Sequence, residues 1–121
     1  MTIFVAGHET TANALAWAIH ALNDNPQVAD TLYDEVKSFT DKKLDIDFLM
    51  QHSYLKMFAD ELLRVYPPIW IIGRRTINED EIGGFRIRKM TNILMPIYLY
   101  HHDKNFWTNP EVFDPYRFRV S

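Results

Sequence analysis

Residues 61–68 read Glu61-Leu62-Leu63-Arg64-Val65-Tyr66-Pro67-Pro68, and they mark the change from a helical first half of the chain to a β-rich second half. Apolar residues at positions 55, 58, 62 and 65 follow helical spacing, and Ser53 precedes them as a candidate N-cap. The two prolines end this helix, because the residue before a proline avoids the helical region. Glu61 and Arg64 share one face, although spacing alone favours an ordinary surface ion pair.

The residues before this stretch predict further helices. Ile3 to Leu22 is apolar on more than one side, which is typical of a helix buried within a larger protein. Because this segment has no cap at residue 1, we expect a helix that has been cut. Asn25-Pro26 predicts a second helix, with Asn25 as its N-cap and an apolar face running to Phe39. A short helix is expected from Asp47 to Gln51.

The residues after the prolines predict strands. Ile69 to Ile72 is a short apolar run suited to a buried strand, which residues 74–77 continue. Gly83-Gly84 predicts a hairpin turn into a strand at 85–88, and Asn92 to Tyr98 predicts another strand with Pro96 at an edge or end. The segment from 101 to 118 is rich in turn residues and aromatics. The chain therefore reads as one unit over residues 1–121, mainly α with a small antiparallel β-sheet.

Composition narrows the class of protein. The 121 residues are 47% hydrophobic and 24% charged, which is typical of a folded globular chain. Thirteen Lys and Arg against sixteen Asp and Glu give a net charge of −3, which argues against a nucleic-acid partner. Cysteine is absent, so the chain holds no disulfide, thiolate metal ligand or cysteine nucleophile. It shows no signal peptide or apolar run of membrane-spanning length, and localisation stays unknown.

The first candidate site is Ala6-Gly7-His8-Glu9-Thr10-Thr11, inside the opening helix. A glycine in mid-helix costs about 1 kcal/mol relative to alanine, which the close approach of a flat ligand or a local bulge would explain. We therefore expect the helix to be disturbed between Gly7 and Thr10. Glu9 and Thr10 supply an acid and a hydroxyl for a proton relay. On composition alone, a tightly packed helix with a surface glutamate is favoured. A zinc-protease motif is excluded, because position 12 is Ala12 and not histidine.

The second half holds two weaker candidates. Arg74 ends an apolar strand, where it either binds a carboxylate or simply reaches solvent. Arg117 stands between two aromatic residues in an irregular segment and is a candidate structural anchor. The five histidines show no metal-ligand spacing, and His101 and His102 are interpreted as polar loop residues.

The order and spacing of these motifs together resemble the cytochrome P-450 family, the haem-thiolate monooxygenases. The resemblance covers essentially all 121 residues, and the motifs that carry it are Ala6 to Thr11, Glu61-x-x-Arg64 with Val65-Tyr66-Pro67-Pro68, Gly84-Phe85-x-Ile87, His101-x-Asp103, and Trp107 to Phe118. Some positions depart from the family pattern. Arg88 and Met90 stand where a proline and a glycine are usual, Tyr116 where glutamate is frequent, and His102 where arginine is frequent.

The resemblance implies roles for named residues. Glu9 and Thr10 correspond to the acid–alcohol pair that delivers protons to bound dioxygen, and Ala6 and Gly7 to positions against the porphyrin face. Arg74 corresponds to the residue that binds a haem propionate. Ile69 and Trp70 correspond to positions that border the substrate. The family's buried structural triad maps to Glu61, Arg64 and Arg117.

The resemblance also implies a cofactor and partners. The parent protein is expected to bind haem b and to insert one oxygen atom from O2 into an apolar small-molecule substrate, with electrons from a redox partner such as a reductase or ferredoxin. The axial Cys of the family lies beyond Phe118, so no metal ligand is expected within this chain, and we expect a partial P-450 fold, incomplete at both ends. Two alternatives remain open, a truncated and catalytically inactive product or a helical interaction module without haem chemistry.

Overall fold

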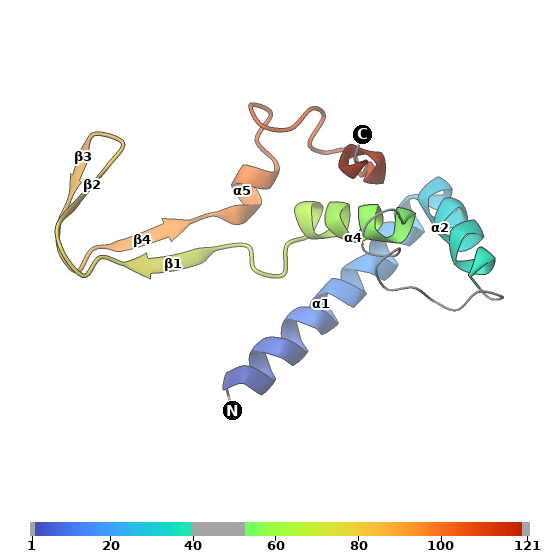
Figure 1. Cartoon of the computed structure of the whole chain (residues 1–121), viewed down its shortest axis with the longest axis horizontal. Coiled ribbons are helices and arrows are strands. Elements are labelled where there is room, and N and C mark those ends of the chain that lie inside the picture. Colours follow the sequence, from blue (N-terminus) through green and yellow to red (C-terminus); the bar gives the residue numbers. More distant parts are fainter. Residues whose placement is uncertain (1, 40–52, 120–121) are drawn as a thin grey trace.

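The structure is a computed structural model that describes residues 2–39 and 53–119 (Figure 1). The helix expected from Asp47 to Gln51 lies outside the described residues. Among the described residues before the strands, three helices are present: α1 (Thr2–Asp24), α2 (Pro26–Ser38) and α4 (Tyr54–Val65). After α4 come β1 (Ile72–Arg75), β2 (Asp80–Ile82), β3 (Phe85–Ile87), β4 (Asn92–Met95), α5 (Ile97–His101) and the short 3₁₀ helix η1 (Pro115–Phe118). The predicted fold class, mainly α with small antiparallel pairing, is confirmed.

The strands form two separate antiparallel pairs. β1 pairs with β4, with Ile72 opposite Met95 and Arg75 opposite Asn92. β2 pairs with β3 around Gly83 and Gly84, both of which have positive φ, as the hairpin turn requires. Figure 1 shows the two strand pairs as an arm that extends to the left of the helices, while α1 runs below α4 toward the lower left. The arm and α1 thus diverge from α4 in different directions.

A small apolar core joins the three long helices. Ala21, Phe58 and Leu62 are buried, and partly buried apolar residues from α1, α2 and the C-terminal segment pack against them. Trp17 of α1 stacks on Tyr66, with ring centroids 4.5 Å apart and planes within 3°. Within the described part of the chain, no helix is long and apolar enough to cross a membrane.

The helix termini differ from expectation at one point. Ser53 caps α4 as predicted, because its side chain accepts a hydrogen bond from the Lys56 N–H at 3.0 Å. Asn25 precedes α2, but its side chain does not cap that helix. Its Nδ2 donates instead to the Ala21 carbonyl at 2.8 Å, so it satisfies the C-terminal end of α1. The sequence pattern identified the helix boundary but assigned the amide to the wrong helix.

Three further expectations are corrected by the structure. α1 runs unbroken through Gly7 to Thr10, and the Thr10 hydroxyl donates to the Ala6 carbonyl at 2.7 Å within the continuous helix. The strand expected from Ile69 begins only at Ile72, since the prolines hold the preceding residues in an extended connection. The strand expected through Tyr98 ends at Met95, because Pro96 starts α5 instead.

Candidate functional site

A buried ion pair joins Glu61 and Arg64 near the end of α4. Their side chains are 0% and 1% exposed. Arg64 Nε donates to Glu61 Oε2 at 2.7 Å, and Arg64 Nη2 donates to Oε1 at 2.9 Å, so the pair is bidentate. The surface pair that spacing alone favoured is therefore wrong, because the C-terminal segment covers this face of α4.

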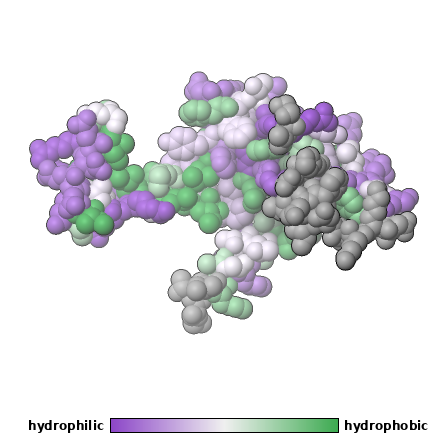
Figure 2. Space-filling view, viewed as in Figure 1, coloured by the Kyte–Doolittle hydropathy of each residue, from purple (hydrophilic) through white to green (hydrophobic). Residues whose placement is uncertain are grey.

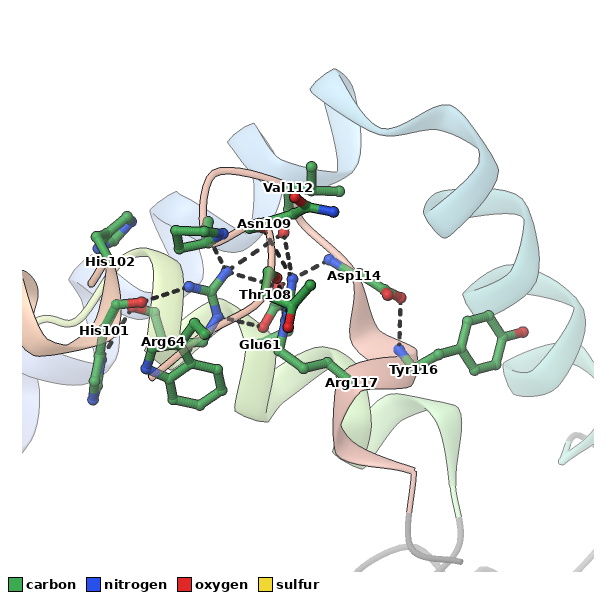
Figure 3. A network of polar contacts seen from close by, with 12 residues as sticks. Glu61, Arg64, His101, His102, Thr108, Asn109, Val112, Asp114, Tyr116 and Arg117 are labelled. Carbon is green, nitrogen blue, oxygen red and sulfur yellow. Dashed lines mark hydrogen bonds and ion pairs between the residues drawn. The ribbon is translucent and has the colours of Figure 1, made fainter. Parts of the chain in front are cut away.

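Arg117 of η1 completes the cluster. Its Nε lies 3.4 Å from Glu61 Oε1, and its guanidinium also donates to three backbone carbonyls, those of Thr108, Asn109 and Val112. Figure 3 shows Glu61, Arg64 and Arg117 pointing toward one another from α4 and η1. The structure thus brings together the three residues of the expected triad. Their role in a whole protein stays a prediction.

Backbone groups satisfy the rest of this cluster. Arg64 donates to the carbonyls of His101 and Pro110 at 2.7 and 2.8 Å, and the Asp114 N–H donates to Glu61 Oε1 at 2.9 Å. Among the described residues, no buried side-chain nitrogen or oxygen lacks a hydrogen-bond partner. The Glu61–Arg64 pair can be buried because its remaining donors and acceptors are also paired.

Sequence reasoning missed His101. It was interpreted as a polar loop residue, but it is the last residue of α5, and its Nδ1 lies 3.1 Å from the Arg64 carbonyl. Trp107 also contacts Arg64, whose guanidinium carbon lies 5.1 Å from the Trp107 ring centroid. The sequence signal for both residues was their match to the family stretches His101-x-Asp103 and Trp107 to Phe118. Such a match does not show which residues these side chains contact.

Glu9 lines a pocket between α1 and the residues that end and follow α4. The pocket has a volume of about 770 Å³ and is lined by Glu9, Asn13, Trp17, Val65, Tyr66, Pro67, Pro68, Trp70, Tyr98, His102 and Glu111. Trp70, one of the two predicted substrate-bordering residues, therefore shares a pocket with the predicted catalytic acid. Burial raises the pKa of the Tyr66 phenol, and Asp24 and Tyr98 raise it further, so this side chain is a neutral hydrogen-bonding group at neutral pH.

Thr10 opens into a different pocket. This one has a volume of about 400 Å³ and is lined by Thr10, Thr11, Ala14, Leu63, Pro67, Pro68 and Ile69. The other predicted substrate-bordering residue, Ile69, thus lines the same pocket as Thr10. The structure does not bring Glu9 and Thr10 into one pocket, because adjacent residues of a helix point about 100° apart. Pro67 and Pro68 line both pockets.

The predicted haem-facing residues are open. Ala6 is exposed, and a Cβ built on Gly7 would meet no atom within 4 Å. Arg74 is exposed on β1, and its Nη1 donates to the neighbouring Gly73 carbonyl at 2.9 Å. Across residues 2–39 and 53–119, no cluster of three or more His, Cys, Asp or Glu side chains is arranged to hold a metal ion.

Comparison with known proteins shows the family to which the chain belongs. The family model for cytochrome P450 matches residues 1–121. The chain belongs to the cytochrome P450 family. It is 36% identical over 119 residues to a P450 of Mycobacterium tuberculosis, 38% over 119 residues to mouse cytochrome P450 3A13, and 32% over 120 residues to human cytochrome P450 4V2. These matches cover 98%, 96% and 97% of this chain but only 26%, 24% and 23% of the relatives.

The family implies haem, and the residues present fit one wall of a haem site. Gly7 and Ala6 leave an open, small-residue surface on α1, which is what the approach of a flat ring needs. Arg74 offers an exposed guanidinium suited to a carboxylate. The P450 iron is held by a cysteine thiolate, and this chain has no cysteine. The axial ligand of the family is therefore not among the residues of this chain.

Proposed function

We propose that this chain is part of a haem-dependent monooxygenase, in which it supplies the oxygen-activation helix and the buried triad. One observation carries the proposal. Each predicted catalytic side chain shares a pocket with a predicted substrate-bordering side chain, Glu9 with Trp70 and Thr10 with Ile69. The chain spans about a quarter of the length of the relatives it matches, so the activity belongs to the whole protein.

The reaction proposed for the whole protein inserts one atom of O2 into an organic substrate. The second atom leaves as water, with two electrons from a redox partner and two protons from solvent. When bound, haem supplies the oxygen chemistry. The apolar, exposed side chains of Ile69 and Trp70 favour an apolar substrate.

The chain's own residues would position groups and move protons. The Thr10 hydroxyl donates to the Ala6 carbonyl, so its oxygen lone pairs remain available to accept a hydrogen bond. Glu9 would hold and release a proton at its carboxylate. Because Glu9 and Thr10 face different pockets, transfer between them needs a bridging water or a rotation of the Glu9 side chain. Ala6 and Gly7 would admit the ring, and Arg74 would bind a propionate.

A chimera tests this proposal. Residues 1–121 replace the matching stretch of mouse cytochrome P450 3A13, and the chimera is compared with its Thr10→Ala and Thr11→Ala variants. Thr11 is the matched control, since its hydroxyl makes the same bond four residues back, to the Gly7 carbonyl at 2.9 Å. We expect Thr10→Ala to lower the product formed per O2 consumed by about tenfold or more, and Thr11→Ala to change it little.

The chimera also separates the alternatives. A chimera that binds haem with a thiolate-type spectrum and forms product supports a monooxygenase segment. A folded chimera that binds haem but makes no product in any variant would contradict the proposal and favour a segment that has lost its chemistry. Equal losses in Thr10→Ala and Thr11→Ala would remove the assigned role of Thr10.

A further inference from the structure

Two helices end against each other at Arg64 and His101. The Arg64 carbonyl is among the last carbonyls of α4, and the His101 carbonyl is the last of α5. Carbonyls at helix C-termini have no partner within the helix and need one from elsewhere. Arg64 Nη1 donates to the His101 carbonyl at 2.7 Å, while His101 Nδ1 lies 3.1 Å from the Arg64 carbonyl. Each side chain therefore caps the helix of the other residue.

This reciprocal contact determines which nitrogen of His101 carries a proton. A carbonyl oxygen only accepts, so the contact at 3.1 Å requires a proton on Nδ1. Trp107 packs against both partners. Its ring lies edge-on to His101 with centroids 6.3 Å apart, and its indole N–H donates to the Tyr100 carbonyl at 3.1 Å. The contact between Arg64 of α4 and His101 of α5, here called the α4–α5 joint, is thus packed against Trp107 in the segment that follows α5.

We propose that His101 is a positioning residue, which through its Nδ1–H fixes the backbone at Arg64 and thereby the Glu61–Arg64–Arg117 cluster. Arg64 is the shared member, because the same guanidinium donates to the His101 carbonyl and to Glu61. Glu61 in turn accepts from the Asp114 N–H, 53 residues further along the chain. His101 therefore decides where the segment from 102 to 118 lies against α4. The inference concerns this chain's own fold and stands apart from the proposed haem chemistry.

Amide hydrogen exchange in the 121-residue chain reads out this positioning at one atom. The reporter is the Asp114 N–H, bonded to Glu61 Oε1 at 2.9 Å. The internal control is the Tyr54 N–H, which is bonded to Glu35 Oε1 at 2.6 Å at the opposite end of α4. A general loss of stability raises the exchange rates of both amides equally. Loss of the α4–α5 joint alone raises the exchange rate of the Asp114 amide relative to that of the Tyr54 amide.

Two substitutions of similar polarity separate the geometry from general effects. His101→Asn places an N–H donor at the position of Nδ1, while His101→Gln places it where Nε2 would be. We expect His101→Gln to raise the Asp114 exchange rate relative to Tyr54 by about tenfold, since a carbonyl is left unpaired, and His101→Asn to leave the ratio unchanged. Equal ratios in the two variants, or no change in either, would overturn the proposal.

The unmodified chain gives a direct second test. Long-range nitrogen–proton NMR spectra at pH 8 report which ring nitrogen of each neutral histidine carries the proton. We expect the proton of His101 on Nδ1. A His101 ring with its proton on Nε2 alone would refute the contact itself, whatever the variants do.

Discussion

Arg117 shows how much one side chain does at the residue scale. Its guanidinium donates to three backbone carbonyls and pairs with the fully buried Glu61 carboxylate. Lysine carries the same charge but has no planar fork of donors, so it cannot reach these acceptors together. The energetic importance of Arg117 therefore lies in its geometry more than in its charge.

This geometry predicts a large difference between two Arg→Lys substitutions. Arg117→Lys should lower the free energy of unfolding by about 2 kcal/mol, because the buried Glu61 carboxylate and the three backbone carbonyls lose their shared donors. The matched control is Arg86→Lys. Arg86 pairs with Glu79 on the surface, with side chains 76% and 57% exposed, and that substitution should change stability by less than about 0.5 kcal/mol. Urea denaturation measures both. Equal effects would show that the Arg117 contacts contribute little.

Met90 has a strained backbone conformation. It follows β3 at a position where the cytochrome P450 family usually has glycine, and its φ of 66° lies in the left-handed region. A residue with a Cβ pays about 1–2 kcal/mol there, while glycine gains extra entropy when unfolded. Met90→Gly should therefore stabilise the chain by about 0.5–1 kcal/mol.

A neighbouring glycine substitution serves as the control for Met90→Gly. Lys89 is not among the described non-glycine residues with positive φ, so Lys89→Gly should destabilise by about 0.5–1 kcal/mol. Thermal unfolding of both variants measures the sign. Destabilisation by Met90→Gly would show that the side chain or its exposed packing outweighs the strain.

At the scale of elements, α4 is organised by contacts at both ends. Its N-terminus is capped twice, by Ser53, which directly precedes the helix, and by Glu35 of α2. The Glu35 carboxylate accepts from the N–H groups of Tyr54 and Leu55 at 2.6 and 2.9 Å. A carboxylate at this end also interacts favourably with the helix dipole. Glu35 thus links α2 to α4 across residues 40–52.

Removal of this second cap should be costly. Glu35→Ala leaves two N–H groups of α4 without their charged acceptor and should lower the free energy of unfolding by about 2 kcal/mol. Asp34→Ala removes a carboxylate from the adjacent, exposed position of α2 and should cost less than about 0.5 kcal/mol. Chemical denaturation followed by circular dichroism compares the two. Similar midpoints for both variants would contradict a capping role for Glu35.

Sequence reasoning succeeded where a signal is local. The Ser53 cap, the end of α4 before the prolines and the hairpin at Gly83-Gly84 all depend on a few neighbouring residues, and the structure contains them. It failed where tertiary contacts decide. Ile69 and Trp70 are apolar enough for a strand, but strand pairing begins only at Ile72, opposite Met95. Local propensity does not contain the position of a partner strand.

The candidate site shows the same division. The family resemblance selected Glu61, Arg64 and Arg117, but spacing alone favoured a surface pair for the first two, because their burial depends on the segment around Pro110 and Val112. The polarity of His101 did not reveal its contact with Arg64, 37 residues away. Likewise, the adjacency of Glu9 and Thr10 did not show that they open into separate pockets.

At the scale of the whole molecule, much apolar surface is uncovered. Ile69, Trp70, Leu94 and Leu99 are more than half exposed, and Figure 2 shows hydrophobic atoms at the surface where the β arm meets the helices. The buried apolar core is limited to a few residues around Phe58 and Leu62. A chain that matches about a quarter of each relative accounts for both features, because the rest of a P450 would supply covering residues.

The composition of the whole chain predicts its haem spectrum. P450 chemistry depends on a cysteine thiolate that pushes electron density onto the iron, and none of the 121 residues is cysteine. No rearrangement of the chain can supply that ligand, whereas any of its five histidines could offer an imidazole. The purified chain, given haem, reductant and carbon monoxide, should therefore show either no bound-haem Soret band or an imidazole-type band, and no monooxygenase activity. The Soret region of the absorption spectrum measures this directly, with the mouse 3A13 chimera as the positive control for the thiolate band. A red-shifted thiolate-type band from the isolated chain would contradict the assignment of the axial ligand to a residue outside it.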